Sequence, residues 1–498
     1  MKNTKKTTEI LYWIILSIVI IIGITIRTDV WLNEPSFFGD ETTLLSNIIN
    51  RNFIGIFSAL DSAQSCPTFF LLVNKIIYSF FSLNETALRF FSYLCGIFSL
   101  CIIPFFKDLL FKNKSLNLLL IVMLTLNGEL LYYSQEFKQY SSDVFFTLLI
   151  LLLFFKTKDK VINLKSALIV GVIFGIAGFF SFTLEFLVFS ICLYFIYIFI
   201  RNKSYKPILG LTIPYFFGLL IQYILVFHGT LTNGIMECWS DEPFAFETFN
   251  STIQTISSLT TNLLNEKIVF AIFMIGIIIC IIKDKLLAYI LIMPILLNMI
   301  SGLLDIYPFT NSRVILYLSP IFIILSLKTF DVIPTKNKLI NTTFGFFILL
   351  TILSLYIHAN DYINKTPIGD KSYYYIRSNA REYINHLDKR EIKPTDKIFV
   401  DDQSAGAFDI YYKEKNYDEN IIFQSWQNQL SFNDRDTETQ HMHLNELPKG
   451  TNIWFYNTPH YPNEVRVEEI NEWINENTKI LLSEKDDMGE LLYVEKIK

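Results

Sequence analysis

The feature that most constrains this chain is a series of apolar stretches of about 15–21 residues, which recur as far as residue 359. Each is long enough to cross, or nearly cross, a bilayer, because a spanning helix needs about 20 apolar residues. Hydrophobic residues make up 52% of the chain and charged residues only 18%, and the mean hydropathy is +0.37. This composition excludes intrinsic disorder, coiled coil and collagen. The sequence therefore predicts an α-helical multi-pass membrane protein.

The segments between these stretches alternate in charge. One set is rich in lysine and arginine: residues 2–6, 107–114, 156–165, 201–206, 283–285 and 328–338. The other set is acidic or neutral: residues 27–89, 136–140, 181–185, 228–266 and 305–313. Basic loops stay in the cytoplasm. We therefore expect about 11 transmembrane helices in the inner (plasma) membrane, with the N-terminus in the cytoplasm and the C-terminus on the periplasmic or extracytoplasmic side.

Two segments are assigned by this alternation. Residues 166–200 would form a helix of about 52 Å at 1.5 Å per residue, which is too long for one crossing, so we expect a turn near residues 181–185. Residues 67–83 also look like a span, but counting them would move every later basic loop to the outside. Their polar residues share one face, opposite an apolar face. This pattern predicts an interfacial helix within the first outer loop, 27–89.

The composition changes at residue 360, which we take as the boundary between a transmembrane domain, 1–359, and a soluble domain, 360–498. Four short apolar runs are predicted to be strands: residues 397–400, 421–423, 452–456 and 491–495. Three segments are predicted to be helices: residues 380–389, 407–413 and 467–476. Because strands alternate with helices, we expect a small C-terminal α/β domain on the outer side. No glycine-rich nucleotide motif follows any of these strands.

Charge and cysteine content exclude two further classes. Lysine and arginine number 42, aspartate and glutamate 47, and the formal charge is −5, so we expect no nucleic-acid partner. Six cysteines in 498 residues are too few for a disulfide framework. Cys66 and Cys238 both lie in loops and could pair in an oxidising compartment, but sequence alone leaves that open.

Ionisable residues gather at the outer ends of the predicted spans. A transporter would be expected to carry them near the middle of its spans. Here they are found in the first outer loop, in the turn between spans three and four, and at the start of span ten: Asp40 and Glu41; Glu136, Lys138, Tyr140 and Asp143; and Arg313. This placement favours a site at the outer membrane–water boundary, where a lipid-linked substrate could present its headgroup.

Four stretches carry a resemblance to a known group: Phe38-Gly39-Asp40-Glu41, Gln64-Ser65-Cys66-Pro67, Asn84-Glu85-Thr86-Ala87-Leu88-Arg89 and residues 132–143. They resemble motifs of the C-type glycosyltransferases in the broad family 39 group, whose relatives include protein O-mannosyltransferases and lipid A aminoarabinose transferases. Residues 181–183, Arg313 and residues 405–412 match more weakly. Glu185, and Thr183 in place of the group's usual proline, depart from its pattern.

The resemblance implies sugar transfer from a polyprenyl-phosphate monosaccharide to a glycan, lipid or protein acceptor on the outer face. An acceptor hydroxyl is a weak nucleophile, so a carboxylate must take its proton, and we assign that role to Asp40. Glu41 would orient the acceptor or share a divalent cation, which leaves metal dependence open. Attack opposite the phosphate would invert the anomeric centre.

The departing lipid phosphate needs cations already in place. Lys138 and Arg313 are the two candidates at outer span ends, and Arg89 is a third. Gln64, Glu136, Tyr140 and Asp143 are taken as supporting residues. Each assignment has a structural alternative. The acidic pair could be solvated loop charges, Lys138 an interfacial lysine, Arg313 a headgroup anchor, Glu136 a partner of Lys138, and Arg89 a residue that fixes the start of span two.

Three other functions stay open at this point. A glycan polymerase or ligase would use diphosphate-linked oligosaccharides instead of monophosphate donors. A transporter of polyprenyl-linked glycans would move its substrate without sugar transfer. A non-enzymatic sensor on the outer face would keep its function when Asp40 is replaced by asparagine.

Overall fold

The computed structural model describes residues 2–32, 36–37, 40–230, 249–260, 266–304, 306–309, 313–332, short pieces within 381–412, 444–457, 464–486 and 489–498. The chain divides into two compact units. The first comprises Met1–Asn33 and Asn47–Asn364, and the second comprises Glu34–Ser46 and Lys365–Lys498. Part of the first outer loop thus groups with the C-terminal residues, whereas the composition places all of it with the transmembrane domain. The boundary at residue 359 stays a prediction.

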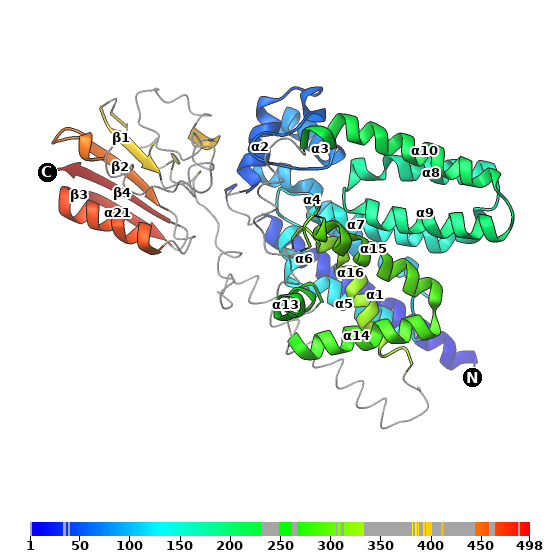
Figure 1. The fold of residues 1–498 in the computed structure, drawn as a ribbon. Coiled ribbons are helices and arrows are strands. Elements are labelled where there is room, and N and C mark those ends of the chain that lie inside the picture. The colour runs from blue at the N-terminus through cyan, green and yellow to red at the C-terminus, as the bar shows by residue number, and fades with distance from the viewer. Residues whose placement is uncertain are drawn as a thin grey trace. The chain divides into compact units, whose positions relative to one another are not determined.

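The first unit is a helical bundle (Figure 1). Its main helices are α1 (Lys2–Leu32), α3 (Thr68–Phe81), α4 (Glu85–Cys101), α5 (Lys114–Leu126), α6 (Gly128–Tyr133), α7 (Tyr140–Thr157), α8 (Leu164–Phe180), α9 (Leu184–Arg201), α10 (Lys206–Gln222), α13 (Phe249–Thr260), α14 (Glu266–Lys283), α15 (Lys285–Leu303) and α16 (Ser319–Lys328). Asparagine side chains accept hydrogen bonds at several helix starts, as Asn84 does from Ala87 N at 2.8 Å before α4.

The described residues include six helices that are long and apolar enough to cross a membrane: Glu9–Leu32, Glu85–Phe106, Tyr140–Lys160, Leu184–Arg201, Lys206–Val226 and Lys285–Leu303. Three further predicted spans correspond to the shorter apolar helices Lys114–Leu126, Leu164–Phe180 and Leu316–Lys328. Helix α14 occupies the predicted eighth span. The eleventh, near residues 340–358, lies outside the described residues. The multi-pass helical fold is confirmed, and the count of 11 stays a prediction.

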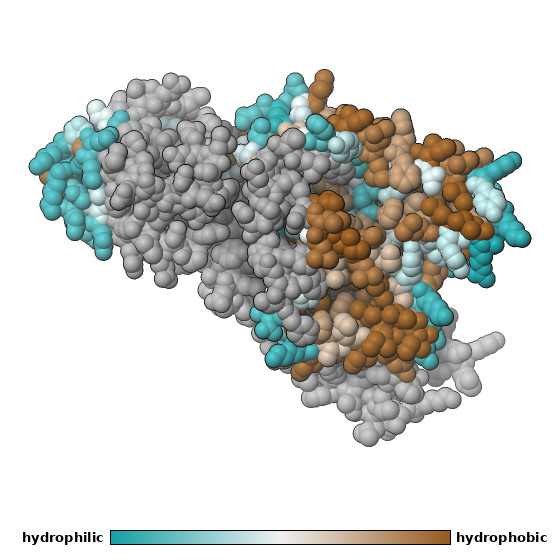
Figure 2. All heavy atoms as spheres, viewed as in Figure 1, coloured by the Kyte–Doolittle hydropathy of each residue, from teal (hydrophilic) through white to brown (hydrophobic). Residues whose placement is uncertain are grey.

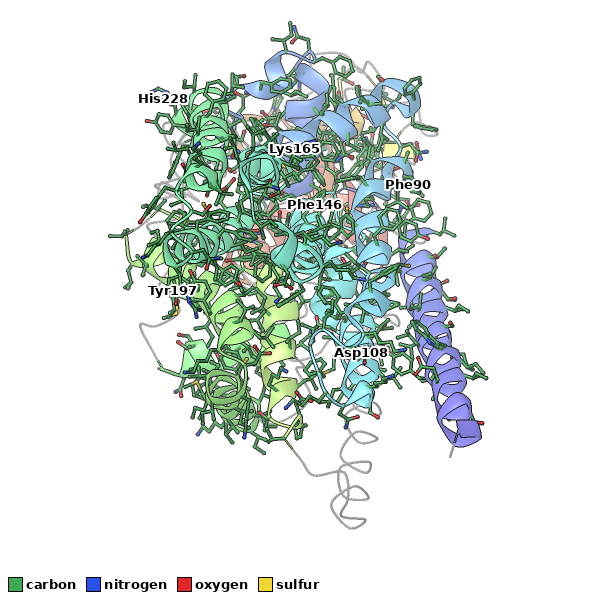
Figure 3. The ribbon with its side chains drawn as sticks, turned by 90° about the vertical axis from the view of Figure 1, so that its right-hand side faces the viewer. Phe90, Asp108, Phe146, Lys165, Tyr197 and His228 are labelled. Carbon is green, nitrogen blue, oxygen red and sulfur yellow. The ribbon has the colours of Figure 1, made fainter. Side chains whose placement is uncertain are left out.

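The basic connections of the first unit gather at one end. Figure 1 shows the start of α1, the α9–α10 connection and the α14–α15 connection on the same side. Figure 2 shows an apolar surface band over the helices, with hydrophilic residues beyond it. Figure 3 looks at the basic end, with Lys165 at the start of α8 and Tyr197 near the end of α9. The charge pattern predicts that this end faces the cytoplasm.

Glycines let α8 and α10 pack backbone against backbone. A Cβ built on Gly171 or Gly175 would meet carbonyl oxygens of α10, and one on Gly218 would meet Gly175 O. Small residues at such spacing permit close helix contacts in membranes, where dispersion and hydrogen bonds replace the hydrophobic driving force. The turn at Ser181–Thr183 separates α8 from α9, as predicted. The three helices therefore form one tightly packed group.

Arg27 is buried within α1 although the sequence places it at the start of the outer loop. Its guanidinium donates to Leu124 O at 3.0 Å and to Thr125 O at 3.1 Å, near the C-terminal end of α5. Exposed carbonyls at a helix C-terminus carry partial negative charge, which offsets the cost of burying the cation. Arg27 therefore joins α1 to α5.

Residues 68–81 form the helix expected in the first outer loop. Helix α3 has 14 residues, or about 21 Å, which is shorter than the roughly 30 Å hydrocarbon core. Phe70, Leu71 and Asn74 face inward, whereas Phe80 and Phe81 are exposed. The Lys75 ammonium donates to Ile48 O at 2.6 Å. The helix is confirmed, and its position in the membrane interface stays a prediction.

The second unit contains a four-stranded sheet in the order β1-β2-β4-β3 (Figure 1). The elements are β1 (Lys397–Val400), β2 (Asn452–Asn457), α21 (Glu464–Asn477), β3 (Thr478–Asp486) and β4 (Gly489–Lys496). Strands β1 and β2 are parallel, and the other pairs are antiparallel. Trp473 and Ile474 of α21 pack with Ile453, Phe455 and Val494 in the core. The predicted α/β character is confirmed, β3 was not predicted, and residues 421–423 lie outside the described residues.

Candidate active site

The candidate phosphate-binding lysine lies in a short connection between α6 and α7. Asn127 caps α6 by accepting from Leu130 N at 3.0 Å, and the chain then reverses over residues 134–139. Lys138 N donates to Glu136 O at 2.7 Å, which tightens this reversal. The Lys138 side chain is only 4% exposed. A buried ammonium is costly unless it has acceptors. The buried Lys138 ammonium therefore needs hydrogen-bond acceptors around it.

Gln64 supplies one such acceptor. Lys138 Nζ donates to Gln64 Oε1 at 2.7 Å, which joins two predicted residues that are 74 positions apart. The same two segments meet again where Gln139 Nε2 donates to Ser65 O at 3.4 Å. Ser92 Oγ of α4 donates to Lys138 O at 3.0 Å. The lysine is therefore fixed from both its backbone and its side chain.

Asp143 and Tyr140 occupy the first turn of α7, directly after this connection. Both are buried, and the Tyr140 ring meets the Tyr133 ring edge-on at 5.0 Å. The Asp143 carboxyl lies close enough to Ser181 in the α8–α9 turn to interact with its hydroxyl. Ser181 Oγ itself lies 3.0 Å from Thr183 Oγ1. The structure thus brings residues 140–143 close to residues 181–183. The two segments belong to separate sequence motifs.

The segment that leads to Arg313 reaches the same region. Tyr307 OH donates to Val314 O at 3.2 Å, and the Tyr307 ring packs on Phe186 of α9 at 5.9 Å. Burial raises the pKa of the Tyr307 phenol, and the nearby Asp143 and Tyr140 raise it further. Arg313 itself is half-buried. Tyr307 therefore lies close enough to Asp143 and Tyr140 of α7 to interact electrostatically with both.

Two other predicted residues take different positions. Arg89 lies in the first half of α4 and has no exposed surface. Glu136 is half-buried in the α6–α7 connection. Glu136 O accepts the backbone bond from Lys138 N. Their proposed roles stay predictions.

Cys66 lies between Gln64 and the start of α3 as a buried free thiol. Burial raises the pKa of this thiol well above its usual value. Lys138 opposes that rise and Asp143 adds to it, so both charged groups act on Cys66. Cys238 lies outside the described residues. Cys66 therefore lies close enough to Lys138 and Asp143 to be affected by both.

The acidic pair belongs to the second unit. Asp40 begins α2 (Asp40–Asn50), and its side chain lies outside the described residues. Glu41 is buried, with 1% exposure. Just before them, Phe37 N donates to Tyr411 OH at 2.8 Å, and Arg381 N donates to Ser36 Oγ at 3.2 Å. The segment that carries the candidate base is therefore bound to the C-terminal part of the chain.

Sequence reasoning missed several residues of this region. Ser92 gave no signal, because a single serine in an apolar helix is common. Tyr411 fell within the weakly matching residues 405–412, but nothing indicated that it binds residue 37. In the part of the chain that the structure describes, no cluster of three or more histidine, cysteine, aspartate or glutamate side chains could hold a metal ion. A divalent cation at Glu41 stays an open prediction.

Solved structures share this fold, although sequence comparison finds no relative. No family model and no curated protein matches the chain. A crystal structure of ArnT from Cupriavidus metallidurans bound to undecaprenyl phosphate matches it with a TM-score of 0.54 and 7% identity. The apo structure of the same protein matches with a TM-score of 0.55 and 7% identity. Each alignment covers 98% of both chains. The match extends over nearly the whole chain, which therefore has an ArnT-like multi-pass membrane fold.

Proposed function

We propose that this chain is a membrane glycosyltransferase that moves a monosaccharide from a polyprenyl-phosphate donor to an envelope glycan, lipid or protein. The observation that carries the proposal is the buried Lys138 ammonium, held 2.7 Å from Gln64, on a fold whose ArnT neighbour binds undecaprenyl phosphate. An ammonium has three protons to donate. Among the described residues, Gln64 is the acceptor of one Lys138 N–H group. Two N–H groups of the ammonium are then left for a phosphate group.

In the proposed reaction the acceptor oxygen attacks the anomeric carbon. A new carbon–oxygen bond forms as the bond to the donor phosphate breaks, and polyprenyl phosphate leaves with both electrons of that bond. Asp40 takes the acceptor's proton, and the configuration inverts. A phosphate leaving group needs no proton, so the scheme has no general acid, in contrast to a glycosidase. Lys138, with Arg313 and Arg89 as further candidates, stabilises the developing phosphate charge.

The remaining residues have supporting roles in this proposal. Gln64 orients the ammonium, Glu136 and Tyr140 shape the connection around it, and Asp143 anchors the start of α7 to the α8–α9 turn. Glu41 orients the acceptor or shares a divalent cation. The site is proposed to face the outer side of the inner membrane, because the charge alternation predicts a cytoplasmic location for the opposite end of the bundle.

The test is donor turnover in membranes that contain the wild-type chain or Asp40→Asn. Labelled polyprenyl-phosphate monosaccharides are supplied with an envelope extract as the source of acceptor, and release of polyprenyl phosphate is followed. Wild-type release with loss in the variant supports the reaction and the base. Equal release from both removes Asp40 from catalysis. Consumption of diphosphate-linked oligosaccharides alone would instead favour a polymerase or ligase.

A further inference from the structure

A second polar cluster lies between α8, α9 and α10, built on the residue that departs from the family motifs. Glu185 is in the first turn of α9. Tyr215 OH of α10 donates to its Oε2 at 3.0 Å. At the end of α10, Gln222 Nε2 donates to Gly175 O of α8 at 2.9 Å. No lysine or arginine of the described residues forms an ion pair with this carboxyl group. The usual way of compensating a buried carboxylate is therefore missing.

Two buried side-chain oxygens of this cluster lie beside Gly178 of α8. Within the described residues, neither Glu185 Oε1 nor Gln222 Oε1 has a hydrogen-bond partner, and both are buried. A Cβ built on Gly178 would stand against both, at 2.7 Å from the glutamate oxygen. The bond to Gly175 O fixes the amide orientation, because a flipped amide would set its oxygen against that carbonyl. A proton on Glu185 Oε1 would let this oxygen donate to Gln222 Oε1 and so satisfy both acceptors.

We propose that Glu185 is a neutral carboxylic acid whose Oε1–H donates to Gln222 Oε1, and that it is a positioning residue for the site. The proton satisfies both oxygens, while Oε2 accepts from Tyr215. Glu185 then joins the start of α9 to both α10 hydrogen-bonding residues at the point where α8 and α10 are in backbone contact. An unsatisfied buried polar pair would instead cost stability.

The α8–α9 turn links this cluster to the candidate site. Glu185 N donates to Phe182 O, and Leu184 N donates to Ser181 O, so the turn and the glutamate form one local structure. Ser181 also lies close enough to the Asp143 carboxyl at the start of α7 to interact with it. Loss of the Glu185 proton would move the turn and, with it, Asp143. This step rests on the proposed function, whereas the protonation itself does not.

Other titratable groups face Glu185 from the helices around it. Tyr215 of α10 is its hydrogen-bond donor, Cys192 of α9 lies close enough to interact electrostatically, and Asp143 of α7 reaches the same turn through Ser181. The Tyr215 and Cys192 groups are uncharged in their ordinary forms near neutral pH. Of these three groups, Asp143 is the one whose charge could change together with that of Glu185. The variant Asp143→Asn tests its contribution.

The first experiment compares Glu185→Gln with Glu185→Leu in detergent micelles. The glutamine amide can donate to Gln222 Oε1 and accept from Tyr215, as the protonated acid does, whereas leucine of similar size can do neither. We expect the glutamine variant to match the wild-type Tm and the leucine variant to unfold several degrees lower. The wild-type infrared spectrum should contain a carboxylic-acid carbonyl band that is absent from both variants. An ionised Glu185 with a bridging water would instead give no such band and a strongly destabilised glutamine variant.

The second experiment measures undecaprenyl phosphate affinity between about pH 6 and about pH 9. The wild-type affinity should fall with rising pH more steeply than that of Glu185→Gln, because only the wild type can lose the Glu185 proton. The affinity of Glu185→Leu should be about 10- to 100-fold weaker than wild type at every pH. Parallel pH profiles for wild type and Glu185→Gln would overturn the positioning role. If undecaprenyl phosphate does not bind any variant, the proposed function fails, while the infrared band and the Tm difference still decide the protonation.

Discussion

The two groups of candidate site residues are built in different ways. The Lys138 region is fixed inside the first unit by hydrogen bonds to Gln64 and from Ser92, through contacts among helices and their connections. The segment of Asp40 and Glu41 belongs to the other compact unit and is bound through Phe37 to Tyr411. Under the proposed function, the first unit would bind the donor phosphate and the second unit would supply the base.

The largest expected effect separates the two groups directly. Asp40→Asn should lower kcat by about 10²- to 10⁴-fold, because it removes the proposed base. Undecaprenyl phosphate affinity should stay unchanged, since the phosphate is assigned to the membrane unit. Turnover and lipid binding are measured on the same preparation. An equal loss of lipid binding in Asp40→Asn would contradict the assignment of the phosphate and the base to different units.

The next effect concerns Lys138→Met. Loss of a charge-assisted hydrogen bond of about 1.5–3 kcal/mol should weaken undecaprenyl phosphate binding by about 10- to 100-fold. Lys165→Met is the matched control, because Lys165 is an exposed lysine at the opposite, basic end of the bundle. Binding is measured by titration in micelles. Equal affinities for the two variants would remove Lys138 from the phosphate site.

A smaller effect tests the second unit. Tyr411→Phe removes the hydroxyl that accepts from Phe37 N, and a neutral hydrogen bond is worth about 0.5–1.5 kcal/mol, so turnover should fall by about 2- to 10-fold. Tyr493→Phe is the control, because its hydroxyl donates to Asp396 within the same unit at 3.3 Å. Steady-state kinetics should show a change in turnover with lipid affinity preserved. If the Tyr493 variant loses as much turnover, the Tyr411 bond has no specific role.

The smallest effect reports on the space beside Lys138. Burial raises the pKa of Cys66, so little thiolate forms at about pH 8 and alkylation should be slow. Lys138 lowers that pKa, so Lys138→Met should raise it further and slow the labelling. Peptide mass spectrometry measures the rate, with the half-buried Cys101 as an internal reference. Faster labelling in the variant would show that access, and not the lysine charge, controls this thiol.

Much of the fold could be predicted, because the bilayer fixes span length and polarity. The helices, the turn near residue 181 and strand β1 at Lys397–Val400 all follow from local patterns. Strand β3 was missed although Thr478–Asp486 contains the apolar run Ile480-Leu481-Leu482, because that run directly follows helix α21 with no turn residues between them. The grouping of Glu34–Ser46 with the C-terminal unit could not be predicted, since it depends on a contact between residues 374 positions apart.

For the site, sequence motifs identified Lys138 and Gln64, and the structure pairs them. The motifs could not show that Ser92 binds the Lys138 backbone, because Ser92 differs in no local pattern from other serines. Glu185 was noted only as a departure from the family, and its partners on α8 and α10 emerge from helix packing. Side-chain contacts between helices depend on the angle and register at which the helices cross. Local patterns in a single sequence do not predict these.

The bond between Phe37 and Tyr411 also has a consequence for biosynthesis. Residue 37 emerges from the ribosome long before its partner, and at about 5–20 residues per second the intervening 374 residues take about 20–75 s to translate. Through that interval the segment before Asp40 lacks its C-terminal contact. A chain that stops early therefore has its membrane helices but an unfinished acidic loop, which separates insertion into the membrane from acquisition of activity.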